Sequence, residues 1–531
     1  MILRRGSRLC AAVAVAALAA GVLAPGTAVA GAGAPRARAV PAIPFDLNGD
    51  GYAELAVGSP GESLGGARGT GVLTILDGSS SGVRTAGARF ISQDTPGIAG
   101  TNESDDAFGS AMSSGDFNRD GYADLAVGAV YEKRGAYPRS QGSVTVLYGS
   151  PHGVKGRDDQ LFLPQQLRVE DVWGAVLDSG DLNGDGYADL VIASGPPRTH
   201  FHPHGGLTIL YGSANGLGMR GAVHLTDPTT TSPGSGPRDR FARSVAVGDL
   251  TGDGIADLAV DTVHGADEAG IYLYRGRSTR LSTTPDTVLA EGGPELATPD
   301  TTFVDLGATL TIGDFDGDGH GDLAAGDGRG EPPGSAGCTK TANCPGLVLV
   351  LPGAVTGVDT SRKQVWSAES PGIPGAVKEL VFGGALASGD LDGDGHADLA
   401  IATSFAEAAG PVAYADGAVR VLYGSGAGLT AARTQSWRQA TPGVAGHSEP
   451  DDAFGAGLRI TALRGPGRQD LAVSVPGETV GHAQDAGATN VLYGESGTGL
   501  VTAGNQQWSE ASPGVPGAPE TYDAFGLLGG S

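Results

Sequence analysis

The sequence predicts an all-β protein: a seven-bladed β-propeller of four-stranded blades, with the ring closed by the C-terminal strand in the first blade. Three observations support this fold. An acidic phrase recurs along the chain, short runs of β-favouring residues surround each copy, and turn residues are abundant. The 531 residues include 91 Gly and 32 Pro, while hydrophobic residues still make up 40%. Such a chain is rich in turns and can nevertheless build a core.

The acidic phrase recurs in register at intervals of 65 to 76 residues. Its first copy reads Asp-Leu-Asn-Gly-Asp-Gly-Tyr-Ala-Glu, and a seventh copy near Thr461 has lost most of its acids but keeps Asp470. The six acidic copies begin at Asp46, Asp116, Asp181, Asp249, Asp314 and Asp390. A period of this length indicates a repeat architecture in which each unit packs against its neighbours.

Each repeat contains four short strand-like runs. An aromatic–Gly pair such as Phe108-Gly109 opens the first run, and an apolar run directly after the acidic phrase forms the second. A third run opens with Gly, as in 142–149, and a fourth is clearest at 364–367. Runs rich in Val, Leu, Ile and Tyr between Gly, Pro and Asp turns are typical of strands. Four strands per unit fit one propeller blade, and packing blades around an axis buries both faces of each sheet.

The strand count predicts seven blades. First strands begin at Phe108, Trp173, Phe241, Leu306, Phe382, Phe454 and Phe525, and the second and third strands also number seven. No aromatic–Gly strand precedes Asp46, whereas the chain ends in one. The C-terminal segment is therefore expected to supply the inner strand of the first blade, which removes an exposed sheet edge.

The N-terminus is predicted to be an export signal over 1–30, followed by a linker over 31–41 and the propeller over 42–531. A basic start, an apolar run over 11–23 and a small-residue site at 28–30 are typical of a signal peptide. We expect a secreted protein without a membrane span, because no later segment has 18 consecutive apolar residues. Cys338 and Cys344 are expected to form a disulfide in an oxidising compartment, with a two-cysteine metal site as the alternative.

A formal net charge of −25 excludes nucleic acid as an expected partner, since phosphate-binding proteins need a basic surface. It also disfavours adhesion to anionic lipid. We expect a monomer whose partner is an extracellular protein or glycan that the sequence does not identify.

The acidic phrases predict about six Ca²⁺ sites. Calcium takes six to eight oxygen ligands. The side chains at loop positions 1, 3, 5 and 9 and the backbone carbonyl at position 7 can supply them, and the glycine at loop position 6 permits the sharp turn. An EF-hand would need an acid at position 12, where this chain has apolar residues such as Val57. An Asp-Gly turn on a solvated surface remains the bland alternative. The expected ligands are Asp46, Asn48, Asp50, Tyr52 and Glu54; Asp116, Asn118, Asp120, Tyr122 and Asp124; Asp181, Asn183, Asp185, Tyr187 and Asp189; Asp249, Thr251, Asp253, Ile255 and Asp257; Asp314, Asp316, Asp318, His320 and Asp322; and Asp390, Asp392, Asp394, His396 and Asp398.

Taken together, the aromatic–Gly pairs, acidic loops and Gly-opened third strands resemble FG-GAP repeats over nearly all of 42–531. These repeats build the seven-bladed propeller of integrin α subunits and occur in secreted bacterial proteins. The resemblance implies partner contacts on the face opposite the calcium loops. The chain departs from the pattern at Trp173, at Phe241-Ala242, at Leu306-Gly307 and in the acid-poor loop 463–467, which is not expected to bind an ion.

Two classes of function remain open. The first is a calcium-stabilised extracellular binding or adhesion scaffold. The alternative is a secreted hydrolase or lectin-like protein with its site at the propeller funnel. Catalysis has little support from the residues: Gly78–Gly82 matches the G-x-S-x-G pattern, but it follows a third strand, where other repeats also have a Gly-Ser turn, and no catalytic residue is assigned.

Overall fold

The computed structural model describes residues 42–133, 141–154, 159–164, 172–195, 206–228, 240–264, 268–290, 293–296, 306–327, 346–374, 379–405 and 417–529. The expected signal peptide, the linker up to residue 41, and both Cys338 and Cys344 lie outside these residues. Val40–Ser531 forms one compact unit, to which the description below applies. No helix in the described ranges is both long and apolar enough to cross a membrane.

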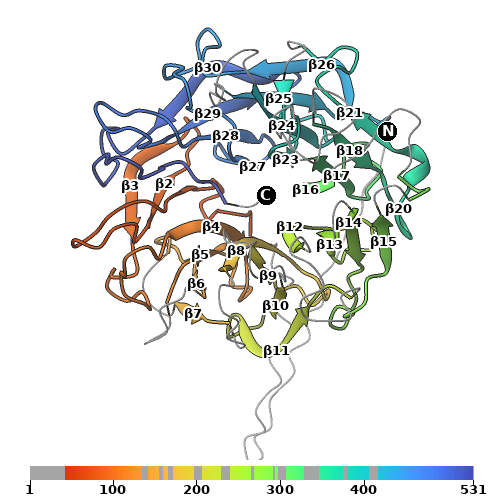
Figure 1. Ribbon diagram of the computed structural model, residues 1–531, viewed down its shortest axis with the longest axis horizontal. Helices are drawn as coiled ribbons and strands as arrows, with labels where there is room; N and C mark the ends of the chain where they lie inside the picture. The colour runs from red at the N-terminus through yellow and green to blue at the C-terminus, as the bar shows by residue number, and fades with distance from the viewer. Residues whose placement is uncertain are drawn as a thin grey trace, which may run out of the picture. The chain divides into compact units, whose positions relative to one another are not determined.

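Seven antiparallel sheets follow one another around an axis (Figure 1). The first blade holds β1 (Leu55–Ser59), β2 (Val72–Asp77) and β3 (Arg84–Ile91). The second holds β4 (Phe108–Gly115), β5 (Asp124–Ala129), β6 (Ser143–Leu147) and β7 (Gln160–Phe162). The third holds β8 (Val172–Gly180), β9 (Asp189–Gly195), β10 (Leu207–Tyr211) and β11 (Gly218–Leu225). The fourth holds β12 (Arg240–Gly248), β13 (Asp257–His264), β14 (Glu268–Tyr274) and β15 (Thr287–Ala290).

The fifth blade holds β16 (Leu306–Gly313), β17 (Asp322–Asp327), β18 (Val348–Leu351) and β21 (Gln364–Trp366), with the small hairpin β19 (Gly353–Ala354) and β20 (Gly357–Val358) and the 3-10 turn η1 (Thr360–Arg362) between them. In the sixth, β22 (Glu379–Leu380) and β23 (Leu386–Gly389) both pair with β24 (Asp398–Phe405), followed by β25 (Ala418–Tyr423) and β26 (Thr430–Trp437). The seventh holds β27 (Leu458–Thr461), β28 (Asp470–Val475), β29 (Ala488–Glu495) and β30 (Gly499–Trp508). The predicted seven-bladed, all-β fold is confirmed.

Burial is greatest in the middle strands of a blade. Every residue of β1 and β5 is buried, whereas the outer strand β3 is exposed or half-buried at every position before Ile91. The middle strands are covered by a neighbouring blade on both faces, so they are apolar at nearly every position. The core accordingly lies between blades: one cluster joins Leu55 and Val83 of the first blade to Val491 of the seventh and to Phe525.

Neighbouring blades approach each other through glycine. A Cβ built on Gly58, in β1, would lie 2.0 Å from the Gly109 carbonyl oxygen in β4 of the next blade. Only a residue without a side chain fits such a contact. These Gly positions therefore allow the backbones of neighbouring blades to approach closely. Gly109 itself has φ +90° and lies where the register between β4 and β5 shifts.

The C-terminal segment lies along the inner edge of the first blade. Leu527 forms an antiparallel bridge with Gly58, and the Gly58 amide donates to the Leu527 carbonyl at 2.8 Å. A Cβ on Gly487 would collide with the Phe525 backbone, just as one on Gly417 would collide with Phe454. Phe525 therefore takes the place in the first blade that an aromatic residue takes in other blades. The inner strand expected here is reduced to a single bridge beside the three strands of the first blade.

Candidate metal centres

The six acidic loops all lie between the first and second strands of a blade, or before β1 in the first blade. Each loop is shaped by hydrogen bonds from its own backbone. In the first loop the Asp50 and Gly51 amides donate to the two Asp46 carboxylate oxygens at 3.1 and 2.9 Å, and the Tyr52 amide donates to Asp50 at 3.1 Å. The equivalent three bonds occur in all the other five loops. These bonds orient the carboxylates at positions 1 and 5 within each loop.

The acid at position 9 is buried beneath each loop, at the start of the second strand. Its side chain is at most 2% exposed in every copy. In the second loop, Asp124 accepts the amide of Phe117 at position 2 and the amide of Gly149 at the end of the third strand, both at 2.9 Å. The same pair of acceptor bonds recurs at Asp189, Asp322 and Asp398. The acid at position 9 therefore joins the loop to the sheet.

Burial raises the pKa of the acid at position 9 in every loop, and the neighbouring loop carboxylates raise it further. The pKa reaches about 8 at Glu54, Asp124 and Asp189, about 7 at Asp398, and about 6 at Asp257 and Asp322. These values describe the loops without a cation. A positive charge held among the carboxylates would favour their ionised form.

Two loops bring three carboxylates to within ligand distance of one another. One oxygen each from Asp314, Asp316 and Asp322 lies within 4.8 Å of the others, and the same holds for Asp390, Asp392 and Asp398. These are the two loops with an acid at position 3 as well as at positions 1, 5 and 9. The acids at position 5 are exposed in all six loops, so they lie at the rim of each site.

The other four loops carry an amide or hydroxyl at position 3. In the first loop the Asn48 amide donates to Glu54 at 2.6 Å, and in the fourth loop Thr251 is 3% exposed and its backbone amide donates to Asp257 at 3.1 Å. The Thr251 hydroxyl lies 3.5 Å from the Asp249 carboxylate. Position 3 therefore contacts position 9 in the first loop and position 1 in the fourth, while in the second loop the Asn118 amide donates to Asp120 at position 5.

The seventh loop holds a resident cation in place of the acids. Arg464 corresponds to position 3, and its guanidinium Nε and Nη2 donate to Asp470 at position 9 at 3.1 and 3.0 Å. The side chain is 11% exposed and also stacks on Tyr493, at 4.5 Å from the ring centroid. Sequence reasoning identified this loop as acid-poor but missed the role of Arg464. The signal was present, because an Arg stands where the other loops have Asn, Thr or Asp.

The donor set of the six acidic loops fits a hard divalent cation. All the converging side-chain groups are carboxylate, amide or hydroxyl oxygens, which Ca²⁺ and Mg²⁺ prefer. In the seventh loop a guanidinium pairs directly with the buried acid at position 9. In the fifth and sixth loops Arg362 and Arg433 instead contact the acid at position 3, with distances of 3.1 Å to Asp316 and 2.7 Å to Asp392.

The loops are also joined to one another around the ring. The amide at position 8 of each loop donates to the position 1 carbonyl of the preceding loop, as from Ala123 to Asp46 at 3.0 Å. The series continues from blade to blade, and the bond from Ala53 to Ala462 carries it from the seventh loop to the first at 3.0 Å. These hydrogen bonds therefore link each loop to the loop of the next blade.

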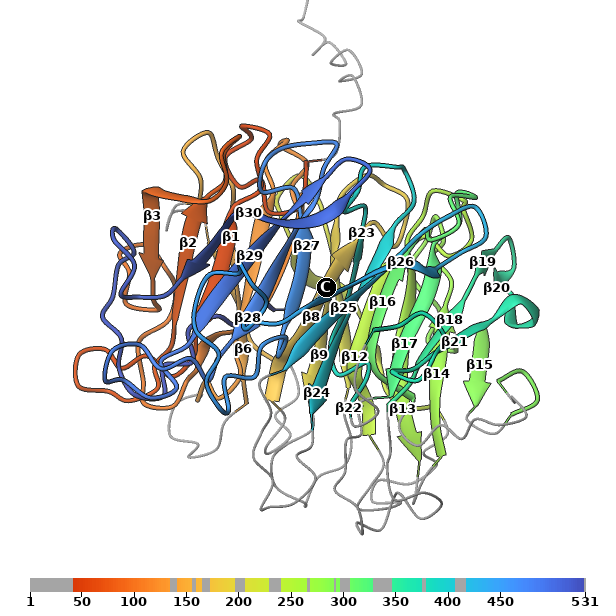
Figure 2. The same cartoon turned by 90° about the horizontal axis from the view of Figure 1, so that it is seen from above.

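A cavity of about 240 Å³ lies on the propeller axis, lined by the first strands. Figure 1 shows these strands around the centre of the ring, and Figure 2 shows several of them, among them β8, β12 and β16, from the side. Among the described lining residues Asp178 is the one carboxylate, and it accepts backbone amides of Ser179 and Val247, both at 2.8 Å. Arg459 is 2% exposed and lies 4.1 Å from the Phe45 ring centroid. No cluster of acids or histidines converges on this cavity in the described part of the chain.

The Gly78–Gly82 match to a nucleophile motif is a turn, as predicted. The Ser79 hydroxyl donates to the Gly82 carbonyl at 2.6 Å, and Ser150 and Ser213 make the same bond to Gly153 and Gly216 in later repeats. This serine therefore stabilises a repeated turn.

Comparison with known proteins agrees with the fold and the loops. The FG-GAP repeat family matches residues 42–76, 108–147 and 382–422, and the FG-GAP-like repeat family matches residues 181–260. Phosphatidylinositol-glycan-specific phospholipase D from Rattus norvegicus is 35% identical over 161 residues, which cover 30% of this chain and 18% of that protein. Integrin alpha-PS2 from Drosophila melanogaster is 32% identical over 160 residues, which cover 28% of this chain and 11% of that protein.

The matched segments thus span less than a fifth of either curated relative. Among solved structures, a glycoside hydrolase family 43 arabinoxylan arabinofuranohydrolase from Bacillus subtilis aligns at a TM-score of 0.32 and 12% identity, over 64% of this chain and 69% of that one. A similarity that low carries no functional argument. The repeat families, the integrin relatives and the seven blades agree: the chain contains FG-GAP repeats and forms a seven-bladed β-propeller.

Proposed function

We propose that this protein is a secreted calcium-binding propeller that serves as an extracellular binding or adhesion scaffold. The observation that carries the proposal is the set of six loops with acids at the same positions, linked by backbone hydrogen bonds from one blade to the next. A bound Ca²⁺ supplies positive charge at each loop and holds its oxygen ligands together. The protein positions the ligand side chains: the loop amides orient the acids at positions 1 and 5, and the sheet orients the acid at position 9.

Two further observations support the calcium part. Three carboxylates gather in the fifth loop and in the sixth, where Arg362 and Arg433 contact the acid at position 3 and the acid at position 9 forms no ion pair with a described residue. In the seventh loop Arg464 pairs with the acid at position 9. Extracellular modules bind Ca²⁺ with dissociation constants of about 10⁻⁴ to 10⁻³ M, which suits exposed loops of this kind. The signal-like N-terminus, which lies outside the described residues, is consistent with such a compartment.

The binding part rests on the shape of the scaffold. Calcium loops lie at one end of the second strands, and the connections between second and third strands lie at the other. Long connections at that second end, such as the one that begins after β5, are carried on a rigid ring. Binding residues are often placed on such loops. The segments that match this chain in the integrin and phospholipase relatives form part of longer chains there.

The calcium proposal is tested by thermal unfolding in excess Ca²⁺ and in EDTA. We expect a higher melting temperature in Ca²⁺, because a ligand that binds the folded state alone stabilises it. Asp394→Asn removes an exposed ligand of the sixth loop and should reduce the gain from Ca²⁺ while leaving the metal-free melting temperature unchanged. Glu369→Gln removes an exposed charge outside the loops and is the matched control. Identical unfolding of the wild-type protein in Ca²⁺ and in EDTA would refute the calcium sites.

The ligand is sought with glycan and extracellular-protein arrays probed with calcium-loaded protein. We expect binding that disappears in EDTA. Binding that persists equally in EDTA would separate ligand recognition from the calcium loops and would contradict the scaffold proposed here.

A further inference from the structure

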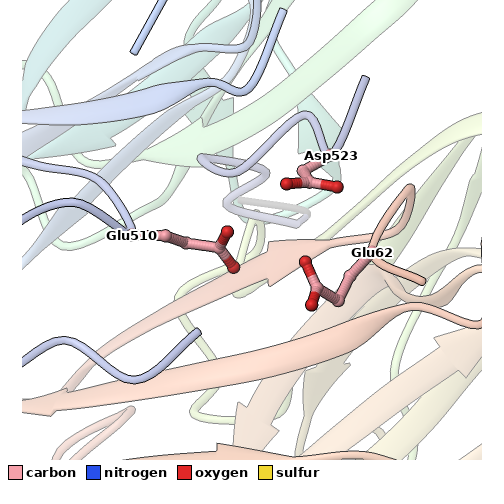
Figure 3. Close-up of side chains that lie close together, drawn as sticks. All are labelled: Glu62, Glu510 and Asp523. Carbon is pink, nitrogen blue, oxygen red and sulfur yellow. The ribbon is translucent and has the colours of Figure 1, made fainter. Parts of the chain in front are cut away.

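Three buried acids meet where the last blade joins the first. Glu62 follows β1 in the first blade, Glu510 follows β30 in the seventh, and Asp523 precedes Phe525 in the C-terminal segment. One carboxylate oxygen from each lies within 4.8 Å of the others. Figure 3 shows the three side chains pointing toward one another from separate segments of the chain. Glu62 and Glu510 are each 5% exposed and Asp523 is 1% exposed.

The acids of this seam triad (Glu62, Glu510 and Asp523) lack donors for several oxygens. Both carboxylate oxygens of Glu510 and Oε2 of Glu62 are buried without a hydrogen-bond donor. The Glu520 amide donates to Asp523 Oδ2 at 2.5 Å, which satisfies one oxygen of the three groups. Buried carboxylates without donors are costly, and a buried charge is normally paired or bound to a metal.

Two other blade junctions contain the same pocket with one chemical difference. Glutamine replaces Glu510 in both, and its amide donates to the pocket glutamate: Gln93 donates to Glu132 at 2.5 Å, and Gln439 donates to Glu478. The pocket aspartates accept a backbone amide in the same way as Asp523. The residues of the two glutamine pockets are Gln93, Asp106 and Glu132 between the first and second blades, and Gln439, Asp452 and Glu478 between the sixth and seventh.

The chain therefore replaces the glutamine donor with a third acid at the one junction that joins the two ends of the propeller. An ionised glutamate at this position cannot donate to Glu62 as glutamine does, so in that form the seam pocket has lost an internal hydrogen bond and gained a negative charge. We propose that the seam triad binds a divalent cation, Ca²⁺, which bridges the first blade, the seventh blade and the C-terminal segment.

This site is separate from the calcium loops. Glu54 belongs to the first calcium loop and precedes β1, whereas Glu62 follows β1, so the two acids lie at opposite ends of that strand. At about 3.3 Å per residue, the five residues of β1 separate the two sites by more than about 15 Å. Three carboxylates suit a hard cation, and Zn²⁺, which favours nitrogen and sulfur ligands, fits less well.

A shared proton is the competing way to hold these acids together. Burial and the neighbouring acids raise the pKa of Glu510 to about 9 and that of Glu62 to about 7 when no cation is present. At constant pH, added Ca²⁺ raises the melting temperature through this site if a cation holds the triad, and does not do so if a proton holds it. The experiment must therefore compare variants in both media.

The test uses Glu510→Gln in the full-length protein, because glutamine at this position is already accommodated at two junctions. Melting temperatures of the wild-type protein and the variant are compared at pH 7.5 in EDTA and in excess Ca²⁺. In EDTA we expect the variant to be the more stable, since glutamine is uncharged without binding a proton and donates a hydrogen bond to Glu62. In Ca²⁺ we expect the wild-type protein to gain more, so that the difference shrinks or reverses.

Two further variants sharpen the result. Gln439→Glu creates a third acid at the junction of the sixth and seventh blades and should add a calcium-dependent gain, while the exposed Glu369→Gln should change neither condition. A difference between the wild-type protein and Glu510→Gln that is the same in both media would overturn the proposal in favour of a shared proton. Failure of the calcium loops is distinguishable, because it removes the effect of Asp394→Asn but leaves the response of Glu510→Gln.

Discussion

Buried charges in this protein are handled in three different ways. Asp178, on the axis, is surrounded by backbone amides, Asp470 is paired with Arg464, and the acids at position 9 of the six loops face other acids. Each solution follows from what lies within reach of the side chain. The residue type alone does not reveal which applies, since all three groups are ordinary carboxylates in the sequence.

Asp178 predicts a pH dependence that is independent of calcium. Burial raises its pKa to about 7, although the Ser179 and Val247 amides oppose the shift. Because the folded-state pKa lies above the unfolded value, this contribution to stability is present below about pH 4 and is lost as the pH rises through 7. Asp178→Asn should therefore unfold at a higher temperature than the wild-type protein at pH 8, with the difference vanishing near pH 4. Melting curves in saturating Ca²⁺ measure this, and a difference that does not vary with pH would contradict it.

The loop is the element on which the fold and the proposed chemistry both depend. Six loops use their backbone amides to orient acids, and the seventh has the same backbone path with a guanidinium inside. The sequence predicted the loops and their acids from repetition, because ligand spacing within nine residues is a local property. It did not predict the pairing in the seventh loop, because the geometry that brings Arg464 onto Asp470 depends on the turn.

Arg464 should be essential to the stability of its blade. Arg464→Met leaves Asp470 buried and unpaired, and breaking a buried pair in this way costs about 3–5 kcal/mol. Arg468→Met is the control, because Arg468 and Glu495 are 42% and 40% exposed, and such a pair contributes less than about 1 kcal/mol. Urea unfolding measures both free energies. Equal losses for the two variants would show that the guanidinium does not replace an ion in this loop.

At the scale of the whole molecule, the ring has a seam at which covalent continuity is absent. Contacts found at other junctions recur there: Tyr493 accepts the Val83 amide at 3.0 Å as Tyr423 accepts the Leu500 amide at 3.2 Å. Phe525 fills the first blade from the C-terminus. Closure then depends on non-covalent contacts of the last residues.

Truncating the aromatic residue at the seam and at an internal junction compares how much each contributes to the free energy of unfolding. Phe525 and Phe454 hold equivalent positions at 0% and 1% exposure. Phe525→Ala and Phe454→Ala should each lower the free energy of unfolding by about 3–5 kcal/mol, since both leave a cavity in a packed core. Denaturant unfolding of both variants gives the comparison. A much smaller loss for Phe525→Ala would show that the C-terminal segment is not held as firmly as an internal first strand.

Repetition within the sequence was enough to predict the number of blades, their strands and the acids of the six loops, because these depend on residues close together in the chain. The closing segment was also foreseen, since one strand was missing at the beginning and one was left over at the end. Other features depend on folding. Glu62 lies about 450 residues from Glu510 and Asp523, and nothing in their local sequence associates them. They become neighbours because the ring closes, and only then do three separate acids share one buried volume.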